Sequence, residues 1–159
     1  MPDLLPPTPP PARFRYADWG ERVGAGMVDW GIALAALLTV STLTGFSDTL
    51  STFGGFVWLG LIGYIAWLNG SKGQSPGKAL MGLKLVRDVD GSTLGGPVGV
   101  VRALVLGVLG TMTGGLFLVL SVLWPLWGQK NQALHDKIVS ASVIAGHPKA
   151  KLGKGIFQP

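Results

Sequence analysis

The sequence predicts an all-α membrane protein: a small bundle of transmembrane helices with short strand-like segments on the cytoplasmic side. Three long apolar stretches, at residues 27–45, 50–68 and 97–127, contain only two ionisable side chains, Asp29 and Arg102. Charged residues make up 13% of the chain, about half the share found in soluble proteins. Because the apolar residues are gathered in blocks rather than spaced at a helical or strand period, the pattern indicates membrane spans.

The first two apolar stretches have the length of transmembrane helices. Each contains 19 residues, and an α-helix needs about 20 residues to cross a bilayer core of roughly 30 Å. Residues 46–49 are expected to form the short turn that joins the two helices.

The third apolar stretch has two interpretations. Its 31 residues would form a helix about 46 Å long, which is too long for one straight crossing. Thr113, Gly114 and Gly115 near its middle favour a hairpin of two short helices, which returns the C-terminal tail to the cytoplasm. The alternative is an interfacial turn that carries Arg102, followed by one span over about residues 105–127. The hairpin is the preferred interpretation.

The remaining segments are polar and short. Residues 1–12 are expected to form a disordered, proline-rich tail, and residues 146–159 a basic C-terminal tail. Residues 69–96 form the only sizeable polar connection between apolar stretches. Within it, the alternating pattern of residues 83–87 predicts a short strand, and residues 140–144 are strand-like as well.

The distribution of Lys and Arg predicts the orientation. The turn at residues 46–49 contains none, whereas the N-terminal segment contains three, the polar connection four and the C-terminal tail five. The positive-inside rule therefore places both termini and the connection in the cytoplasm. The net charge of +5 is then explained by orientation and by contact with anionic lipid. Nucleic acid is not expected as a partner, because no basic stripe interleaved with aromatic residues is present.

A carboxylate inside an apolar stretch marks a candidate site. Burying Asp29 costs on the order of 3 kcal/mol on insertion scales, so the residue needs a partner or a purpose. Arg22 lies seven residues earlier, on the same face of the expected helix, and Arg102 enters the membrane at a similar depth. Asp29 is either an ion- or proton-binding carboxylate or one half of a structural pair, and both arginines are possible partners.

Three basic residues of the polar connection are assigned to the lipid headgroup region or the cytoplasmic surface. Residues 70–78 combine glycines with a lysine, but they lack the spacing of a phosphate-binding loop, and Ala79 stands where that loop needs Ser or Thr. A better interpretation is an interfacial helix from which Lys78 reaches lipid phosphates. Lys84 and Arg87 are expected on the same surface.

The sequence predicts no enzyme, no cofactor and no metal site. The chain has no cysteine, and its 159 residues are too few for a membrane unit plus an independent soluble enzyme. His135 beside Asp136 could shuttle protons near pH 7, but no nucleophile or metal-ligand set accompanies the pair. Docking of the C-terminal tail is the preferred role for these two residues.

Several motifs, in order along the chain, resemble the RDD family of small bacterial membrane proteins. They are Arg22-x-x-Ala25-x-x-Val28-Asp29, the segment from Gly73 to Val86 followed by Asp90-Gly91, Arg102, and Leu134-His135-Asp136-Lys137 before Val143-Ile144. The family is named for an arginine and two aspartates. Arg22 and Asp29 match the first two positions, and Asp136 is assigned to the third. The resemblance covers residues 13–145 and identifies them as an RDD-type transmembrane domain.

The resemblance implies a multi-pass protein of the bacterial cytoplasmic membrane, and it implies function only broadly. Transport is the usual suggestion for the family, and some relatives are described as sodium/proton antiporters. The leading hypothesis is therefore ion or solute transport, including cation/proton exchange, with Arg22, Asp29, Arg102 and Asp136 as candidate ion or proton site residues. A homo-oligomer is expected, because three or four helices hardly enclose a pathway. The alternative is a non-catalytic accessory or scaffold subunit of a membrane complex.

Overall fold

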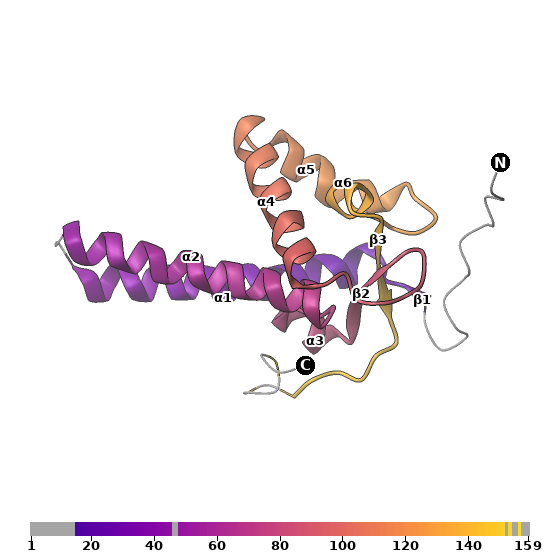
Figure 1. Cartoon of the computed structure of the whole chain (residues 1–159), viewed down its shortest axis with the longest axis horizontal. Helices are drawn as coiled ribbons and strands as arrows, with labels where there is room; N and C mark the ends of the chain where they lie inside the picture. The colour runs from indigo at the N-terminus through magenta and orange to yellow at the C-terminus, as the bar shows by residue number, and fades with distance from the viewer. Residues whose placement is uncertain (1–14, 46–47, 152, 154–155, 157–159) are drawn as a thin grey trace.

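The protein is described from a computed structural model in which two long helices carry a small mixed unit at one end (Figure 1). The long helices are α1 (Trp19–Thr44) and α2 (Asp48–Ser71). The predicted tail at residues 1–12 lies outside the described residues, as does part of the C-terminal tail. The structure describes residues 15–45, 48–151, 153 and 156.

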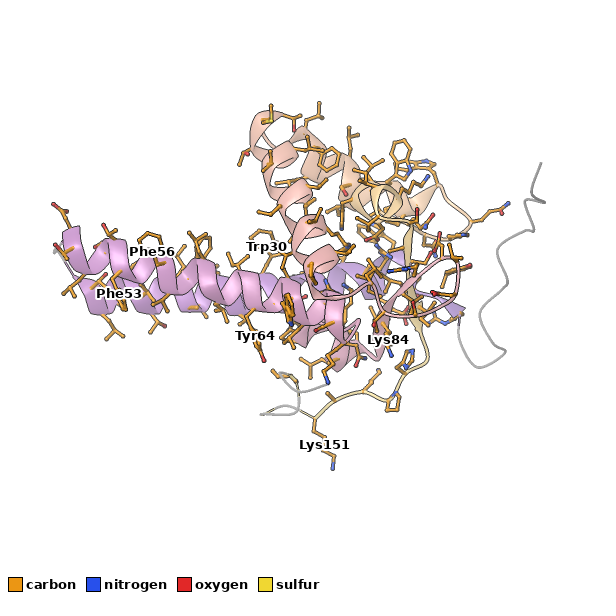
Figure 2. The ribbon with its side chains drawn as sticks, in the orientation of Figure 1. Trp30, Phe53, Phe56, Tyr64, Lys84 and Lys151 are labelled. Carbon is orange, nitrogen blue, oxygen red and sulfur yellow. The ribbon has the colours of Figure 1, made fainter. Side chains whose placement is uncertain are left out.

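α1 and α2 coincide with the first two apolar stretches and are long and apolar enough to cross a membrane. They contain 26 and 24 residues with mean hydropathies of 1.7 and 1.4, and only 11% of each apolar window is buried within the chain. Large apolar side chains point outward from both helices, among them Trp30 of α1 and Phe53 and Phe56 of α2 (Figure 2). A surface of this kind is typical of contact with lipid or with another apolar partner.

The start of α1 is fixed by a capping box. The backbone N–H of Glu21 donates to Asp18 Oδ1 at 2.8 Å, and the backbone N–H of Asp18 donates to Glu21 Oε2 at 3.0 Å. Two N–H groups that the first turn of a helix leaves unpaired are satisfied in this way. α1 therefore begins before its apolar stretch and carries Arg22 in its first turns.

The third apolar stretch is divided into two helices, α4 (Gly96–Met112) and α5 (Leu116–Leu123), with the short 3-10 helix η1 (Trp124–Leu126) after them. The break falls on the three residues where the hairpin interpretation places it. Gly114 and Gly115 have φ angles of 58° and 91°, a region that glycine enters without steric cost. Within the described residues only α1 and α2 pass as membrane spans by length and composition, so the expected bundle is confirmed for its first two apolar stretches alone.

A three-stranded antiparallel sheet joins distant parts of the chain. β3 (Ala141–Ala145) lies in the centre, β2 (Leu83–Arg87) pairs on one side with Lys84 opposite Ile144, and β1 (Arg15–Tyr16) pairs on the other. The two predicted strand-like segments are thus real strands, and the fold is mostly helical rather than all-α. β3 is buried along its whole length, and the core cluster around it includes Leu83, Leu85 and Val143.

Glycines let the helices meet closely beside this sheet. A Cβ on Gly77 of α3 (Pro76–Met81) would lie 1.9 Å from the carbonyl oxygen of Ala25 in α1. A Cβ on Gly99 of α4 would lie 2.4 Å from the carbonyl oxygen of Ala66 in α2. These contacts bring the first turns of α1 and α4 and the last turns of α2 to one place, while α4 and α5 leave in another direction (Figure 1).

Candidate functional site

Asp136 lies at the centre of a buried cluster of charges. It belongs to α6 (Leu134–Ile138), and its side chain is 0% exposed. Arg102 of α4 donates from Nε to Asp136 Oδ1 at 2.7 Å, and its Nη2 lies 2.5 Å from the same oxygen. Arg22 of α1 donates from Nη2 to Asp136 Oδ2. One carboxylate therefore joins α1, α4 and α6.

The charge of Asp136 is set by these two arginines. Burial alone would raise the pKa of this carboxyl, but the guanidinium groups of Arg102 and Arg22 hold its pKa well below the usual range. The carboxylate stays ionised at any physiological pH. A buried ion cluster of this kind is stable only when every member keeps its partners, so Asp136 acts foremost as the group that positions Arg22 and Arg102.

His135 extends the cluster to α5. Its Nε2 lies 2.7 Å from Arg102 Nη2, and its Nδ1 lies 2.5 Å from Ser121 Oγ. Because a guanidinium can only donate, Nε2 accepts and Nδ1 carries the proton that is donated to Ser121. Burial, with a further contribution from Arg102, lowers the pKa of His135 to about 3. A histidine that stays neutral near pH 7 fits the docking role and not the proton-shuttle role.

Lys78 is buried beside the cavity and does not lie on the exposed surface where the sequence pattern places it. Its side chain turns inward because α3 packs against α1 at the contact of Gly77 with Ala25. Lys78 Nζ donates to Asn69 Oδ1 at 2.7 Å. Burial and then the charge of Arg102 lower the pKa of Lys78 to about 7. Burial therefore brings the pKa of this amine close to neutral pH.

Asp29 pairs with neither arginine among the described residues. Its Oδ1 accepts a hydrogen bond of 2.8 Å from the backbone N–H of Gly77, in the first turn of α3. The expected pairing with Arg22 or Arg102 is incorrect, because both arginines form ion pairs with Asp136 instead. N–H groups in the first turn of a helix lack intrahelical partners and favour a negative charge, so Asp29 fixes α3 against α1.

The other two basic residues lie away from this cluster. Lys84 is half-buried on β2, and Arg87, at the end of the same strand, is exposed and donates from Nη2 to the carbonyl oxygen of Leu94 at 3.4 Å. Their contact with lipid headgroups stays a prediction. Within the described part of the chain, no group of three or more His, Asp or Glu side chains is placed to hold a metal ion.

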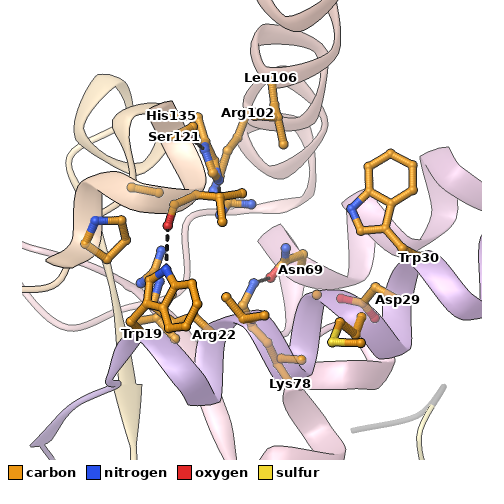
Figure 3. Close-up of a pocket in the computed structure, with 18 residues that line it drawn as sticks. Trp19, Arg22, Asp29, Trp30, Asn69, Lys78, Arg102, Leu106, Ser121 and His135 are labelled. Carbon is orange, nitrogen blue, oxygen red and sulfur yellow. Dashed lines mark hydrogen bonds between the residues drawn. The ribbon is translucent and has the colours of Figure 1, made fainter. Parts of the chain in front are cut away.

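A cavity of about 410 Å³ opens beside the cluster, where α1, α2, α3, α4 and α5 meet (Figure 3). Lys78 and Asn69 lie between Arg22 on one side and Asp29 and Trp30 on the other. Trp19 Nε1 donates to the carbonyl oxygen of Val122 at 2.9 Å, which ties α1 to α5. The polar lining residues are Arg22, Asp29, Asn69, Lys78, Arg102, Ser121 and His135.

Sequence reasoning missed two residues of this site, Asn69 and Ser121. Ser121 is one of the few polar residues within the third apolar stretch, and Asn69 directly follows the second, a signal that could have identified them. Asp136 itself is not a lining residue of the cavity. Asp136 forms ion pairs with two of the lining residues, Arg22 and Arg102.

Comparisons with known proteins identify several relatives of the chain. Proline-rich antigen homologs from Mycobacterium tuberculosis strains ATCC 25618 / H37Rv and CDC 1551 / Oshkosh are each 30% identical over 156 residues, covering 81% of this chain and 63% of the relative. The proline-rich antigen of Mycobacterium leprae is 33% identical over 89 residues, covering 54% and 34%. The chain thus spans less than two thirds of these relatives' length.

No solved structure matches the chain. The family model described as the RDD family matches residues 16–140. This match contains Arg22, Asp29, Arg102 and Asp136, together with both candidate spans and all of α3 to α6. The chain belongs to the RDD family.

Proposed function

We propose that this RDD-family chain takes part in ion or solute transport across the bacterial cytoplasmic membrane, as a multi-pass protein whose N-terminus is cytoplasmic. The observation that carries the proposal is a cavity lined by three basic side chains and one carboxylate at the end of two apolar helices. Ionisable groups within membrane helices commonly mark ion or proton pathways, and the lining carboxylate, Asp29, belongs to α1. Neither the cavity nor the cluster behind it requires enzyme chemistry.

The cytoplasmic position of the cavity is supported by charge. In the described residues, the Lys and Arg side chains gather around the end where α1 begins and α2 ends. An excess of these residues is typical of the cytoplasmic side. The cavity would then face the cytoplasm and would be the inner end of a pathway.

Lys78 is the group that we assign to proton exchange, in place of Asp29. Its pKa of about 7 lets the charge of the cavity change by one near physiological pH. Arg22 and Arg102 keep their charge, and Asp136 stays ionised. Coupling between a proton and a second ion needs one titrating group among fixed charges, and this arrangement supplies it.

An oligomer is part of the proposal. Two long helices cannot surround a pathway, whereas α1 and α2 leave most of their apolar side chains uncovered within one chain. Helices from further copies would complete the wall. Chemical crosslinking in membranes should then yield discrete multiples of the monomer mass.

Flux into liposomes tests this function. Purified protein in liposomes that contain a pH-sensitive dye should move protons when a sodium or potassium gradient is applied. Lys78→Gln should abolish the flux, whereas Lys72→Gln removes an exposed charge outside the cavity lining and should retain it. Wild-type flux no greater than that of empty liposomes would contradict the proposal.

A second candidate function is a non-catalytic accessory or scaffold subunit of a membrane complex. It is favoured by Asp136, whose two oxygens are satisfied by Arg22, Arg102 and the backbone N–H of Ala133. A buried carboxylate with both oxygens paired is what a purely structural role of Asp136 needs. Detergent pull-down should then recover a stoichiometric partner. Purification of an active transporter without a partner would exclude this role.

A further inference from the structure

The cavity has a cationic interior and an apolar rim. The interior presents the side chains of Arg22, Lys78 and Arg102, and the rim includes Met27 and Trp30 of α1 and Val122 of α5. Met27 is 71% exposed and Trp30 63% exposed. These rim residues belong to the outward apolar surface of the helices, so the cavity mouth is continuous with the surface expected to contact acyl chains.

Two buried cations in this cavity have unused hydrogen-bond donors. Arg22 Nη1 is buried and has no hydrogen-bond partner among the described residues. Lys78 Nζ carries up to three N–H donors, and Asn69 Oδ1 accepts one of them. A buried donor without an acceptor is unfavourable, so an acceptor that enters the cavity would stabilise the amine of Lys78, which lines it. Arg22 Nη1 is fully buried and does not face the cavity.

The charges around the cavity leave a positive excess. When Lys78 is protonated, it and the two arginines contribute three positive charges, and Asp29 and Asp136 contribute two negative ones. His135 adds no charge, because burial keeps it neutral. Asp136 is engaged by the arginines and Asp29 by the backbone N–H of Gly77. One further anionic group would balance the site.

We propose that the cavity binds the phosphate headgroup of one anionic phospholipid, whose acyl chains pass over the rim at Met27 and Trp30. The phosphate oxygens would accept from Lys78 Nζ, and the nearby guanidinium groups of Arg22 and Arg102 would add attraction for the negative charge. The inference rests on the membrane placement of α1 and α2 given under the proposed function, and it does not depend on flux. A membrane lipid fits better than a free anion because the free anion would make no use of the apolar rim.

Native mass spectrometry in detergent tests the headgroup contact. The wild-type protein is titrated with palmitoyl-oleoyl phosphatidylglycerol and, separately, with phosphatidylcholine of the same chains. One phosphatidylglycerol should be retained per chain, in preference to phosphatidylcholine. Lys78→Gln should weaken its retention by about 10-fold or more, as expected for a lost hydrogen bond to a charged group. Lys72→Gln, the surface control, should bind like the wild type.

A second pair of variants tests the rim without altering the charged cluster. A Cβ on Gly26, which lines the cavity, meets no atom within 4 Å, and the same is true of Gly31, which does not line it. Gly26→Phe should fill the cavity mouth and reduce retention of phosphatidylglycerol by about 10-fold, whereas Gly31→Phe should not. If Lys78→Gln fails to fold, the comparison of Gly26→Phe with Gly31→Phe still tests whether the cavity binds the lipid.

The possible outcomes are distinct. Equal retention of the two lipids, or Gly26→Phe binding like Gly31→Phe, would overturn the proposal. A thermal shift by inorganic phosphate that requires Lys78, without retention of phosphatidylglycerol, would identify a free anion as ligand and overturn it as well. Lipid binding is measured without an ion gradient. A protein that retains the lipid but moves no ions would therefore refute the proposed transport function and leave the lipid site supported.

Discussion

Arg102 and Asp136, 34 residues apart in the chain, are joined by a hydrogen bond of 2.7 Å from Nε to Oδ1 in the interior of the protein. This contact ties the first turns of α4 to α6, and through α6 to the central strand β3. Arg22 reaches the other oxygen of the same carboxylate from α1. The helices that leave in different directions are therefore held at their common end by one ion cluster.

The first prediction concerns the stability of this cluster. Asp136→Asn removes the charge that two buried arginines share, and leaving such charges uncompensated costs about 3 to 5 kcal/mol. Thermal unfolding in detergent should show a large fall in melting temperature. Asp90→Asn, in an exposed turn, should change stability by about 0.5 kcal/mol or less. Equal effects of the two substitutions would contradict the structural role of Asp136.

The second prediction concerns pH. Lys78 has a pKa of about 7 in the folded protein and an ordinary pKa of 10.5 when unfolded. Between these values the unfolded state binds more protons, so the contribution of Lys78 makes the folded state more stable as pH rises from about 7 toward 10.5. The slope approaches about 1.4 kcal/mol per pH unit. Melting temperatures of the wild type and of Lys78→Gln should diverge over this window, and parallel curves would refute the lowered pKa.

The apolar stretches and the strand pattern were predictable because they are local properties. Blocks of apolar residues define α1 and α2, and the alternation at residues 83–87 matches β2. The turn at Thr113 was also visible, since two successive glycines follow it. Each of these features depends on neighbours within a few residues.

The partners of the charges were not predictable in the same way. Arg22 and Asp136 are 114 residues apart, and only the resemblance to a family suggested that both matter. Asp29 is the acid that the sequence places on the same helix face as Arg22, but its carboxylate accepts a hydrogen bond from the backbone N–H of Gly77 in α3. Lys78 looked like a surface residue because its burial depends on the close contact of Gly77 with Ala25, which no local pattern encodes.

The third prediction tests that close contact. Gly77→Ala would place a Cβ 1.9 Å from the carbonyl oxygen of Ala25, so α3 must move away from α1. Overpacking of this kind costs about 1 to 3 kcal/mol, and the change should also raise exposure of Lys78 to amine-reactive labels. Gly107→Ala is the matched control, because a Cβ there meets no atom within 4 Å. It should leave stability unchanged or improve it by up to about 1 kcal/mol.

The fourth prediction separates two roles of Asp29. Asp29→Asn keeps an oxygen that can accept from the N–H of Gly77, whereas Asp29→Ala removes it. If Asp29 serves only to fix α3, the Asn variant should unfold close to the wild type and the Ala variant should lose roughly 1 kcal/mol. Under the same assumption, the Asp29→Asn variant should retain the proton flux of the wild type in liposomes. Loss of flux in a stable Asn variant would instead identify Asp29 as an ion or proton site.

The fifth prediction concerns the side of the membrane on which the C-terminal segment lies. β1, just before α1, pairs with β3, with Arg15 opposite Ala145. Paired strands cannot be separated by a bilayer, so residues 15 and 145 share one side. If α1 and α2 both cross, the α4–α5 hairpin must return to that side. A fluorescent reporter after residue 159 should be active in the cytoplasm, and an external-only phosphatase reporter inactive there. The same phosphatase placed at residues 46–49 should be active. Reporters that place the two ends of the chain on opposite sides would refute the pairing of β1 with β3.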